Sequence, residues 1–218
     1  MTKGGSPDPS PTANRHRLVG PPDLWEMKRR FQIGFLQQMG LQPHHWLLDL
    51  GCGTLRGGIP LIEYLDTGHY FGLEVRTEVL DEARKELAEN GLTDKSPRLI
   101  HCEHLASLDL GQRFDVIWAF AVLIHMSDPI LDQAARLIAS HLAVGGTFYG
   151  SINRDSKRDG NWQGFPIVHR ELAFYEEVFG RHRLAVTDLG SLRDFGHDHP
   201  RKSAEDQANQ RMLKITRA

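Results

Sequence analysis

The sequence predicts a layered α/β fold with a parallel sheet, and three observations support this prediction. Apolar runs of strand length alternate with helical patterns through five consecutive units. The fourth run, residues 114–120, reads FDVIWAF, and a continuous apolar strand is typical of a parallel sheet that is covered on both faces. The chain has 218 residues, which is enough for one domain with an ample core.

The N-terminal region divides into a tail and a helix. Residues 1–18 hold prolines among glycine, serine, threonine and asparagine, with almost nothing apolar to bury, so we expect a disordered tail there. A single domain is then expected over residues 19–218. Pro21, Pro22 and Asp23 indicate a helix start, and an apolar face continues to Gly40. Residues 19–41 are therefore predicted to form a helix ahead of the first strand.

The stretch from Leu47 to Gly58, LLDLGCGTLRGG, is the clearest ligand-binding motif in the chain. An apolar strand over residues 46–50 is followed by Gly51 and Gly53, which indicate a tight turn into a helix over residues 55–65. Because a glycine has no β-carbon, a ligand can approach the backbone amides at the start of that helix. A strand, a glycine turn and a helix together predict a nucleotide-binding loop.

Two acidic residues sharpen this interpretation. Asp49 stands near the end of the first strand, where its carboxylate can reach the ammonium group of a ligand. The second strand, residues 70–73, ends in Glu74, which can accept hydrogen bonds from both hydroxyls of a ribose. An ammonium group and a ribose in one ligand suggest S-adenosylmethionine as the cofactor.

At these residues the sequence resembles the class I S-adenosylmethionine-dependent methyltransferases, with D-L-G-C-G as their glycine motif and Glu74 as their ribose acid. The resemblance implies a Rossmann-like fold: a seven-stranded, mostly parallel sheet with an antiparallel last strand and helices on both faces. Leu55 departs from the pattern, because many members carry a third glycine there. The cofactor-binding residues implied by the resemblance are Asp49, Gly51, Cys52, Gly53, Glu74, Val75 and Phe120.

The run W-E-M-K-R-R-F-Q, ahead of G-L-Q-P and the R-G-G tail of the loop, resembles one bacterial small-molecule subgroup of this family. By that match Arg30 and Gln32 lie over the cofactor, and Arg30 faces the methionine carboxylate. The alternative is that both are solvated positions on an amphipathic helix.

The rest of the chain supplies the remaining elements. Helices are expected over residues 77–90, 128–141 and 169–179, and further strands over residues 97–102, 147–152, 183–189 and 212–216. Glu103 follows the third strand and either accepts from an adenine amino group or lies in a solvated loop. Residues 154–164 are polar and form either a substrate lid or a plain connection. Residues 190–210 form a long polar segment.

His125 is the best-placed candidate for a catalytic base, because it follows the fourth strand. The alternative is a role in packing or cofactor positioning. His197 and His199 are other candidates. Their H-x-H spacing also suits a metal ion, but no third ligand is identifiable, so no metal site is expected.

Two alternative functions remain open. The glycines fit a loose G-x-G-x-x-x-G, so an NAD(P)-dependent oxidoreductase is possible, although no tyrosine has a lysine four residues on. A non-catalytic S-adenosylmethionine-binding regulatory or scaffold protein is the other. The motifs of DNA methyltransferases and of protein arginine methyltransferases are absent. A small-molecule acceptor methylated on oxygen or nitrogen is left by elimination.

The composition of the chain limits which kinds of partner and which cellular compartment we expect. The formal net charge of −2 argues against a broadly basic nucleic-acid surface. No apolar run is long enough to span a membrane and no apolar signal core begins the chain, so no membrane partner is expected. Cys52 and Cys102 fit a reduced cytoplasmic protein.

Overall fold

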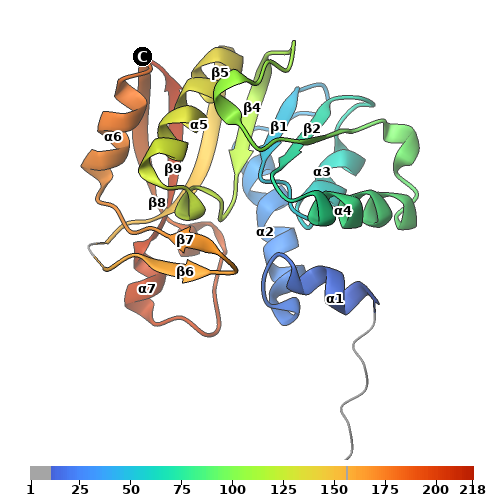
Figure 1. Cartoon of the computed structure of the whole chain (residues 1–218), viewed down its shortest axis with the longest axis horizontal. Coiled ribbons are helices and arrows are strands. Elements are labelled where there is room, and N and C mark those ends of the chain that lie inside the picture. The colour runs from blue at the N-terminus through green and yellow to red at the C-terminus, as the bar shows by residue number, and fades with distance from the viewer. Residues whose placement is uncertain (1–10, 156) are drawn as a thin grey trace, which may run out of the picture.

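A computed structural model describes residues 11–155 and 157–218, and its centre is a mixed sheet of seven strands in the order β3-β2-β1-β4-β5-β9-β8 (Figure 1). The strands are β1 (Leu47–Leu50), β2 (Tyr70–Glu74), β3 (Arg98–His101), β4 (Phe114–Ala119), β5 (Leu142–Asn153), β8 (Leu184–Ser191) and β9 (Gln210–Arg217). The first five are parallel to one another, and β9 is antiparallel to both β5 and β8. The predicted Rossmann-like sheet with an antiparallel last strand is confirmed.

Helices cover both faces of this sheet (Figure 1). They are α1 (Pro11–Arg17), α2 (Trp25–Gln38), α3 (Gly58–Tyr64), α4 (Thr77–Glu89), α5 (Asp128–His141), α6 (Leu172–Gly180) and α7 (Ala204–Asn209). Short 3-10 turns occupy Pro22–Leu24, Thr93–Lys95, Leu105–Ser107, Leu123–His125 and Leu192–Phe195. Within the described residues, no helix is long and apolar enough to cross a membrane.

Two hydrophobic cores lie on the two faces because successive side chains of a strand point to opposite sides. Ile117 of β4 belongs to the core shared with α5 and α6, whereas the next residue, Trp118, belongs to the core shared with α2, α3 and α4. Both side chains are fully buried. This explains why β4 is apolar at nearly every position.

The expected disordered tail is wrong in its second half. Residues 1–10 lie outside the described part of the chain, but residues 11–17 form α1, which is fastened to α4. Arg15 is 3% exposed and donates hydrogen bonds to Glu82, Glu86 and Glu89 at 2.6–3.0 Å. The His16 ring stacks on Trp25 with centroids 3.5 Å apart. Composition missed this helix because a buried guanidinium, rather than apolar surface, anchors it.

Residues 154–164 also differ from the expected irregular segment. Gly160–Trp162 and Phe165–Ile167 form the strands β6 and β7 of a two-stranded antiparallel hairpin. Its turn residues, Gln163 and Gly164, have φ angles of 49° and 85°, which are typical of a tight two-residue turn. The polar segment at 190–210 likewise contains the turn Leu192–Phe195 and helix α7.

Candidate active site

The glycine loop after β1 has the geometry that the sequence predicted. Gly51 and Gly53 have φ angles of 77° and 57°, in the left-handed region that favours glycine. A β-carbon on Gly51 would lie 2.5 Å from Val122, and one on Gly53 would lie 2.8 Å from Val19. These two glycines therefore allow the loop to turn sharply while two other segments close over it.

Leu55 occupies the position of the third glycine and keeps a glycine-like backbone. Its φ is 63°, and its side chain is fully buried in the core beside α2 and α3. Gly58 makes room for it, because a β-carbon there would lie 2.5 Å from Leu55 Cδ2. A β-carbon on Gly57 would lie 2.4 Å from Gln32 Oε1. The two glycines of the R-G-G tail thus make room for the side chains of Leu55 and Gln32.

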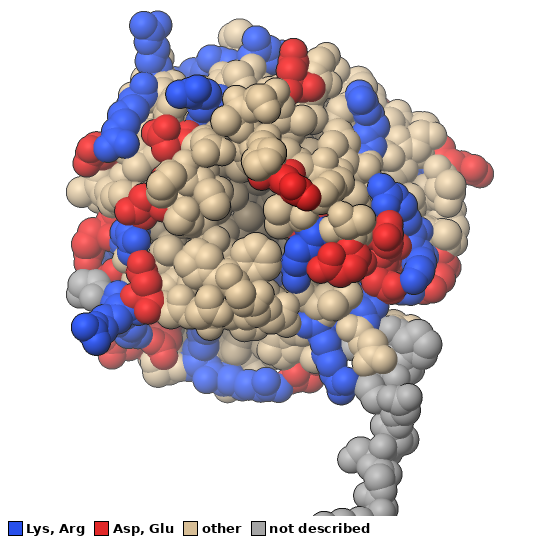
Figure 2. All heavy atoms as spheres, in the orientation of Figure 1, with Lys and Arg blue, Asp and Glu red and all other residues tan. Residues whose placement is uncertain are grey.

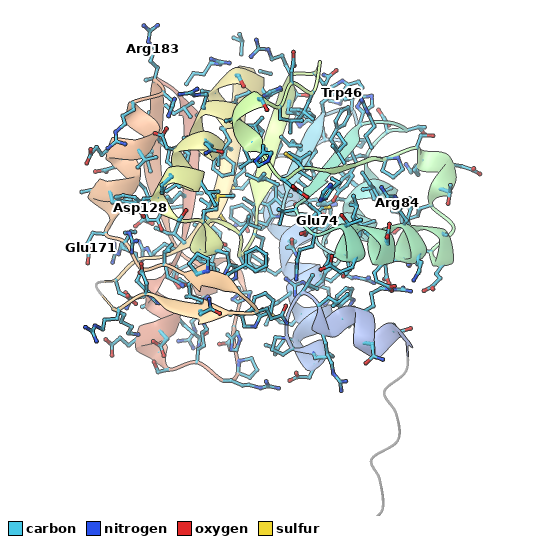
Figure 3. The ribbon with its side chains drawn as sticks, viewed as in Figure 1. Trp46, Glu74, Arg84, Asp128, Glu171 and Arg183 are labelled. Atoms are coloured by element: carbon cyan, nitrogen blue, oxygen red, sulfur yellow. The ribbon has the colours of Figure 1, made fainter. Side chains whose placement is uncertain are left out.

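Both predicted acids line one cavity at the carboxyl ends of the strands. Glu74 is 6% exposed and lies near the middle of the view in Figure 3, whereas Arg183 lies at the upper edge of the molecule. The Glu74 carboxylate accepts from the backbone N–H groups of Gly53, Val75 and Arg76 at 3.0–3.1 Å. It is therefore held between the glycine loop and the end of β2.

Asp49 is the more deeply buried acid. Its carboxylate accepts a hydrogen bond of 2.7 Å from the Tyr70 hydroxyl. Burial raises the pKa of Asp49 to about 7, and the Tyr70 hydrogen bond opposes part of that shift. A cation that entered the cavity beside Asp49 would favour its charged form.

The cavity has a volume of about 430 Å³, which is within the ordinary range for small-molecule sites. In the space-filling view a hollow opens near the middle of the face, with a mostly uncharged rim (Figure 2). The sequence-predicted residues that line the cavity are Gln32, Asp49, Gly51, Cys52, Gly53, Glu74, Val75, Glu103, Phe120 and His125. The structure thus brings together all the predicted site residues except Arg30.

Arg30 is exposed and does not line the cavity. Gln32 is buried, and its Oε1 accepts from Trp118 Nε1 at 3.1 Å. Residues two positions apart on a helix point to nearly opposite sides, so α2 cannot present both inward. Lys28 of α2 and Arg56 of the glycine loop are cations that do line the cavity.

Sequence reasoning did not select Lys28 and Arg56, although both stand within the motifs that carried the resemblance. The Arg56 guanidinium is 8% exposed and donates to the Val19 carbonyl at 2.9 Å, while its Nε has no partner among the described residues. Burial lowers the pKa of Arg56 to about 10. The sequence signal that was available is the arginine of the R-G-G tail.

His125 lies under the β6–β7 hairpin. Its Nδ1 is 2.8 Å from the Pro166 carbonyl oxygen, and its ring is stacked with Trp162 at 5.4 Å between centroids. Because a carbonyl oxygen can only accept, Nδ1 carries the proton and Nε2 keeps its lone pair. Burial lowers the pKa of His125, which favours the neutral imidazole.

The hairpin and the N-terminal segment meet at the edge of the cavity. Arg76 donates to the Leu18 carbonyl at 3.1 Å and to Gln163 Oε1 at 3.4 Å, and Gln163 donates to the Arg17 carbonyl at 3.4 Å. Figure 1 shows α1 and the β6–β7 hairpin gathered at the same end of the molecule. Two segments far apart in sequence therefore cover the cavity together.

The other predicted contacts vary in exposure. Cys52 is buried and unbridged, and its Sγ would lie 2.9 Å from a β-carbon on Gly72. Glu103 is exposed at the cavity edge, with its carboxylate 3.6 Å from His101 Nε2. In the described ranges, 11–155 and 157–218, no group of three metal-ligating side chains is assembled.

Parts of the sequence are similar to known methyltransferases. A family model described as a methyltransferase domain matches residues 48–148. The ubiquinone biosynthesis O-methyltransferase of Actinobacillus pleuropneumoniae is 31% identical over 115 residues, which are 51% of this chain and 47% of that protein. The matched segment is thus less than half the length of that relative.

Two solved structures share the fold. Magnesium protoporphyrin IX methyltransferase from Synechocystis PCC 6803, with S-adenosylmethionine bound, superimposes with a TM-score of 0.66 at 17% identity, over 96% of this chain and 92% of that one. The glycopeptide N-methyltransferase MtfA, complexed with sinefungin, gives a TM-score of 0.66 at 15% identity, over 87% and 94% of the two chains. At such identities the likeness establishes the fold alone.

Proposed function

We propose that the chain is a class I S-adenosylmethionine-dependent methyltransferase, which transfers the methyl group of S-adenosylmethionine to an oxygen or nitrogen atom of a small molecule. The observation that carries this proposal is that Asp49, the glycine loop and Glu74 line one cavity. The similar proteins include a named O-methyltransferase and a named N-methyltransferase, which supports either atom as the acceptor.

The residues of the cavity fit this cofactor. Gly51 and Gly53 have φ angles in the left-handed region that glycine adopts without strain, and both line the cavity, so the loop backbone borders the space for the cofactor. Glu74 is positioned to accept from two ribose hydroxyls, and Asp49 from an ammonium group. Arg56 offers a donor for a carboxylate at the same end of the loop.

When bound, S-adenosylmethionine supplies an electrophilic methyl group on a sulfonium. The protein's contribution is to hold the acceptor atom in line behind that methyl group and to exclude water. The rings of Phe120, Trp162 and Phe165 line the cavity and supply apolar walls for this purpose.

His125 is the group we assign to proton removal. A hydroxyl acceptor loses its proton as the bond to carbon forms, and a protonated amine must lose one before it can attack, because an ammonium nitrogen has no lone pair. His125 Nε2 has a lone pair, because Nδ1 donates to Pro166, and the side chain lines the cavity. A neutral imidazole that lines the cavity supports this assignment.

Calorimetry with S-adenosylhomocysteine, followed by turnover assays with a metabolite panel, tests the proposal. We expect S-adenosylhomocysteine to bind and NAD(P) not to bind. Glu74→Gln, which keeps the side-chain size, should weaken binding by about tenfold because one oxygen acceptor is lost. The matched control is Glu78→Gln, on the exposed face of α4, which should bind as the wild type does.

The outcomes separate the alternatives. Absence of S-adenosylhomocysteine binding contradicts the proposal outright. Binding without turnover on any acceptor would instead favour a regulatory or scaffold protein that uses the same fold.

A further inference from the structure

One end of the cavity collects positive charge that carboxylates of the protein do not neutralise. Lys28 of α2 and Lys202, which precedes α7, are both partly buried and both line the cavity. Among the described residues neither ammonium group is in an ion pair. Asp23, whose negative charge raises the pKa of Lys28, forms an ion pair with Arg201. The two lysines therefore bring positive charge to the cavity that no carboxylate of the described residues pairs with.

The carboxylates near Lys202 are also engaged elsewhere. Asp206 accepts from Lys157 at 2.5 Å, and Asp155 lies 2.8 Å from His169 Nδ1. These surroundings disfavour the charged form of Lys28. Burial, and after it the positive charges of Arg56 and Lys202, lower the pKa of Lys28 to about 7. An anion bound between these groups would relieve the repulsion.

His197 supplies an independent sign of a missing ligand. Its side chain is 3% exposed and lines the same cavity, and neither ring nitrogen has a hydrogen-bond partner among the described residues. The ring makes edge contacts with Phe31 and Phe120, at 5.0 and 5.5 Å between centroids. A buried imidazole without partners is uncommon unless a ligand or water completes its hydrogen bonds.

The segment that carries these groups is held in place before any ligand arrives. Gln207 is 7% exposed, and its Oε1 accepts from the His199 backbone N–H at 3.0 Å. Its Nε2 donates to the Lys202 carbonyl at 3.1 Å. One buried amide therefore fixes both ends of the turn from His199 to Lys202, which lowers the cost of ordering it on binding.

We propose that Lys28, Lys202 and His197 form a subsite for an anionic group, a carboxylate or a phosphate, on the methyl acceptor. This inference rests on the proposed methyltransferase function. We assign the single carboxylate of S-adenosylmethionine to Arg56 beside the glycine loop, whose buried Nε has no partner among the described residues, so the two lysines are left for a second anion. The acceptor is then an amphipathic anion whose apolar body lies against the aromatic walls.

The test measures anion binding to the protein saturated with S-adenosylhomocysteine, using benzoate and inorganic phosphate as probes for the two anion types. We expect at least one probe to bind saturably, and Lys28→Gln and Lys202→Gln each to weaken that binding by about tenfold, the effect of losing one charged hydrogen bond. Lys85→Gln is the control, because Lys85 is exposed on α4 and pairs with Glu82 away from the cavity. The affinity for S-adenosylhomocysteine should be unchanged in all three variants.

Several outcomes would overturn the inference. These are the absence of saturable binding by both probes, and equal probe affinities in the wild type and the two cavity variants. A tenfold loss of S-adenosylhomocysteine affinity in either cavity variant would also overturn it, since that lysine would then serve the cofactor. Failure of the wild type to bind S-adenosylhomocysteine contradicts the proposed function instead, so the two failures are distinguishable.

Discussion

Replacing Gly57 with alanine tests whether the R-G-G tail exists to accommodate Gln32. Gly57 has a φ of −84°, which alanine adopts readily, so backbone strain is not expected. The new methyl group, however, would lie 2.4 Å from Gln32 Oε1 and 2.5 Å from its Cδ. Gln32 must then move, and its hydrogen bond with Trp118 Nε1 is lost.

The magnitude follows from these contacts. Leaving the fully buried indole N–H of Trp118 without a partner costs about 1–3 kcal/mol. Overpacking of the site adds roughly 1–3 kcal/mol. Replacing glycine by alanine near a helix start returns only about 0.5–1 kcal/mol. We therefore expect Gly57→Ala to lower the free energy of unfolding by about 2–4 kcal/mol.

Urea denaturation of four proteins measures this effect: the wild type, Gly57→Ala, Gln32→Ala and the double variant. Gln32→Ala removes the side chain that collides, so the added methyl group should cost little in that background, and the two changes should be strongly non-additive. Gly34→Ala is the matched control, because Gly34 is an exposed residue of α2 and a β-carbon added there would have no neighbour within 4 Å. It should stabilise the protein by about 0.5–1 kcal/mol. A neutral Gly57→Ala, or additive effects in the cycle, would refute the assignment.

Three further predictions concern the chemistry of the cavity. His125→Gln should lower kcat by about 10²–10⁴-fold for an acceptor that loses a proton, with S-adenosylhomocysteine affinity unchanged; an unaltered kcat would show that His125 only packs. In the wild type, kcat should fall only at a pH lower than the ordinary histidine pKa of about 6.5, because burial lowers the pKa of His125 and protonation removes the lone pair. Burial raises the pKa of Asp49 to about 7, so its carboxylate is charged at pH 8 and mostly neutral at pH 6. Affinity for S-adenosylhomocysteine should therefore weaken from pH 8 to pH 6 in calorimetry, and a pH dependence that persists in Asp49→Asn would assign it to another group.

The sequence by itself determined the sheet, the glycine loop and the acids beside it. These features depend on local rules: alternating strand and helix patterns, glycines where the backbone must turn, and a carboxylate at the end of a strand. Gly51, Gly53, Asp49 and Glu74 accordingly line one cavity, as the motif indicated. The positions of β1 and β2 as parallel neighbours are enough to bring the two acids together.

Only the tertiary structure decided which cations face the cavity and how the N-terminal region is held. Arg30 and Lys28 are two residues apart in one basic run, and the packing of Gln32 against Trp118 sets which of them points inward. The docking of α1 depends on hydrogen bonds from Arg15 to α4, about 70 residues further along the chain, and amino-acid composition gives no sign of such a contact. The His197 side chain is buried by aromatic rings from two distant elements. In each case the deciding interaction joins residues far apart in the chain, whereas sequence patterns report only what neighbouring residues demand of the backbone.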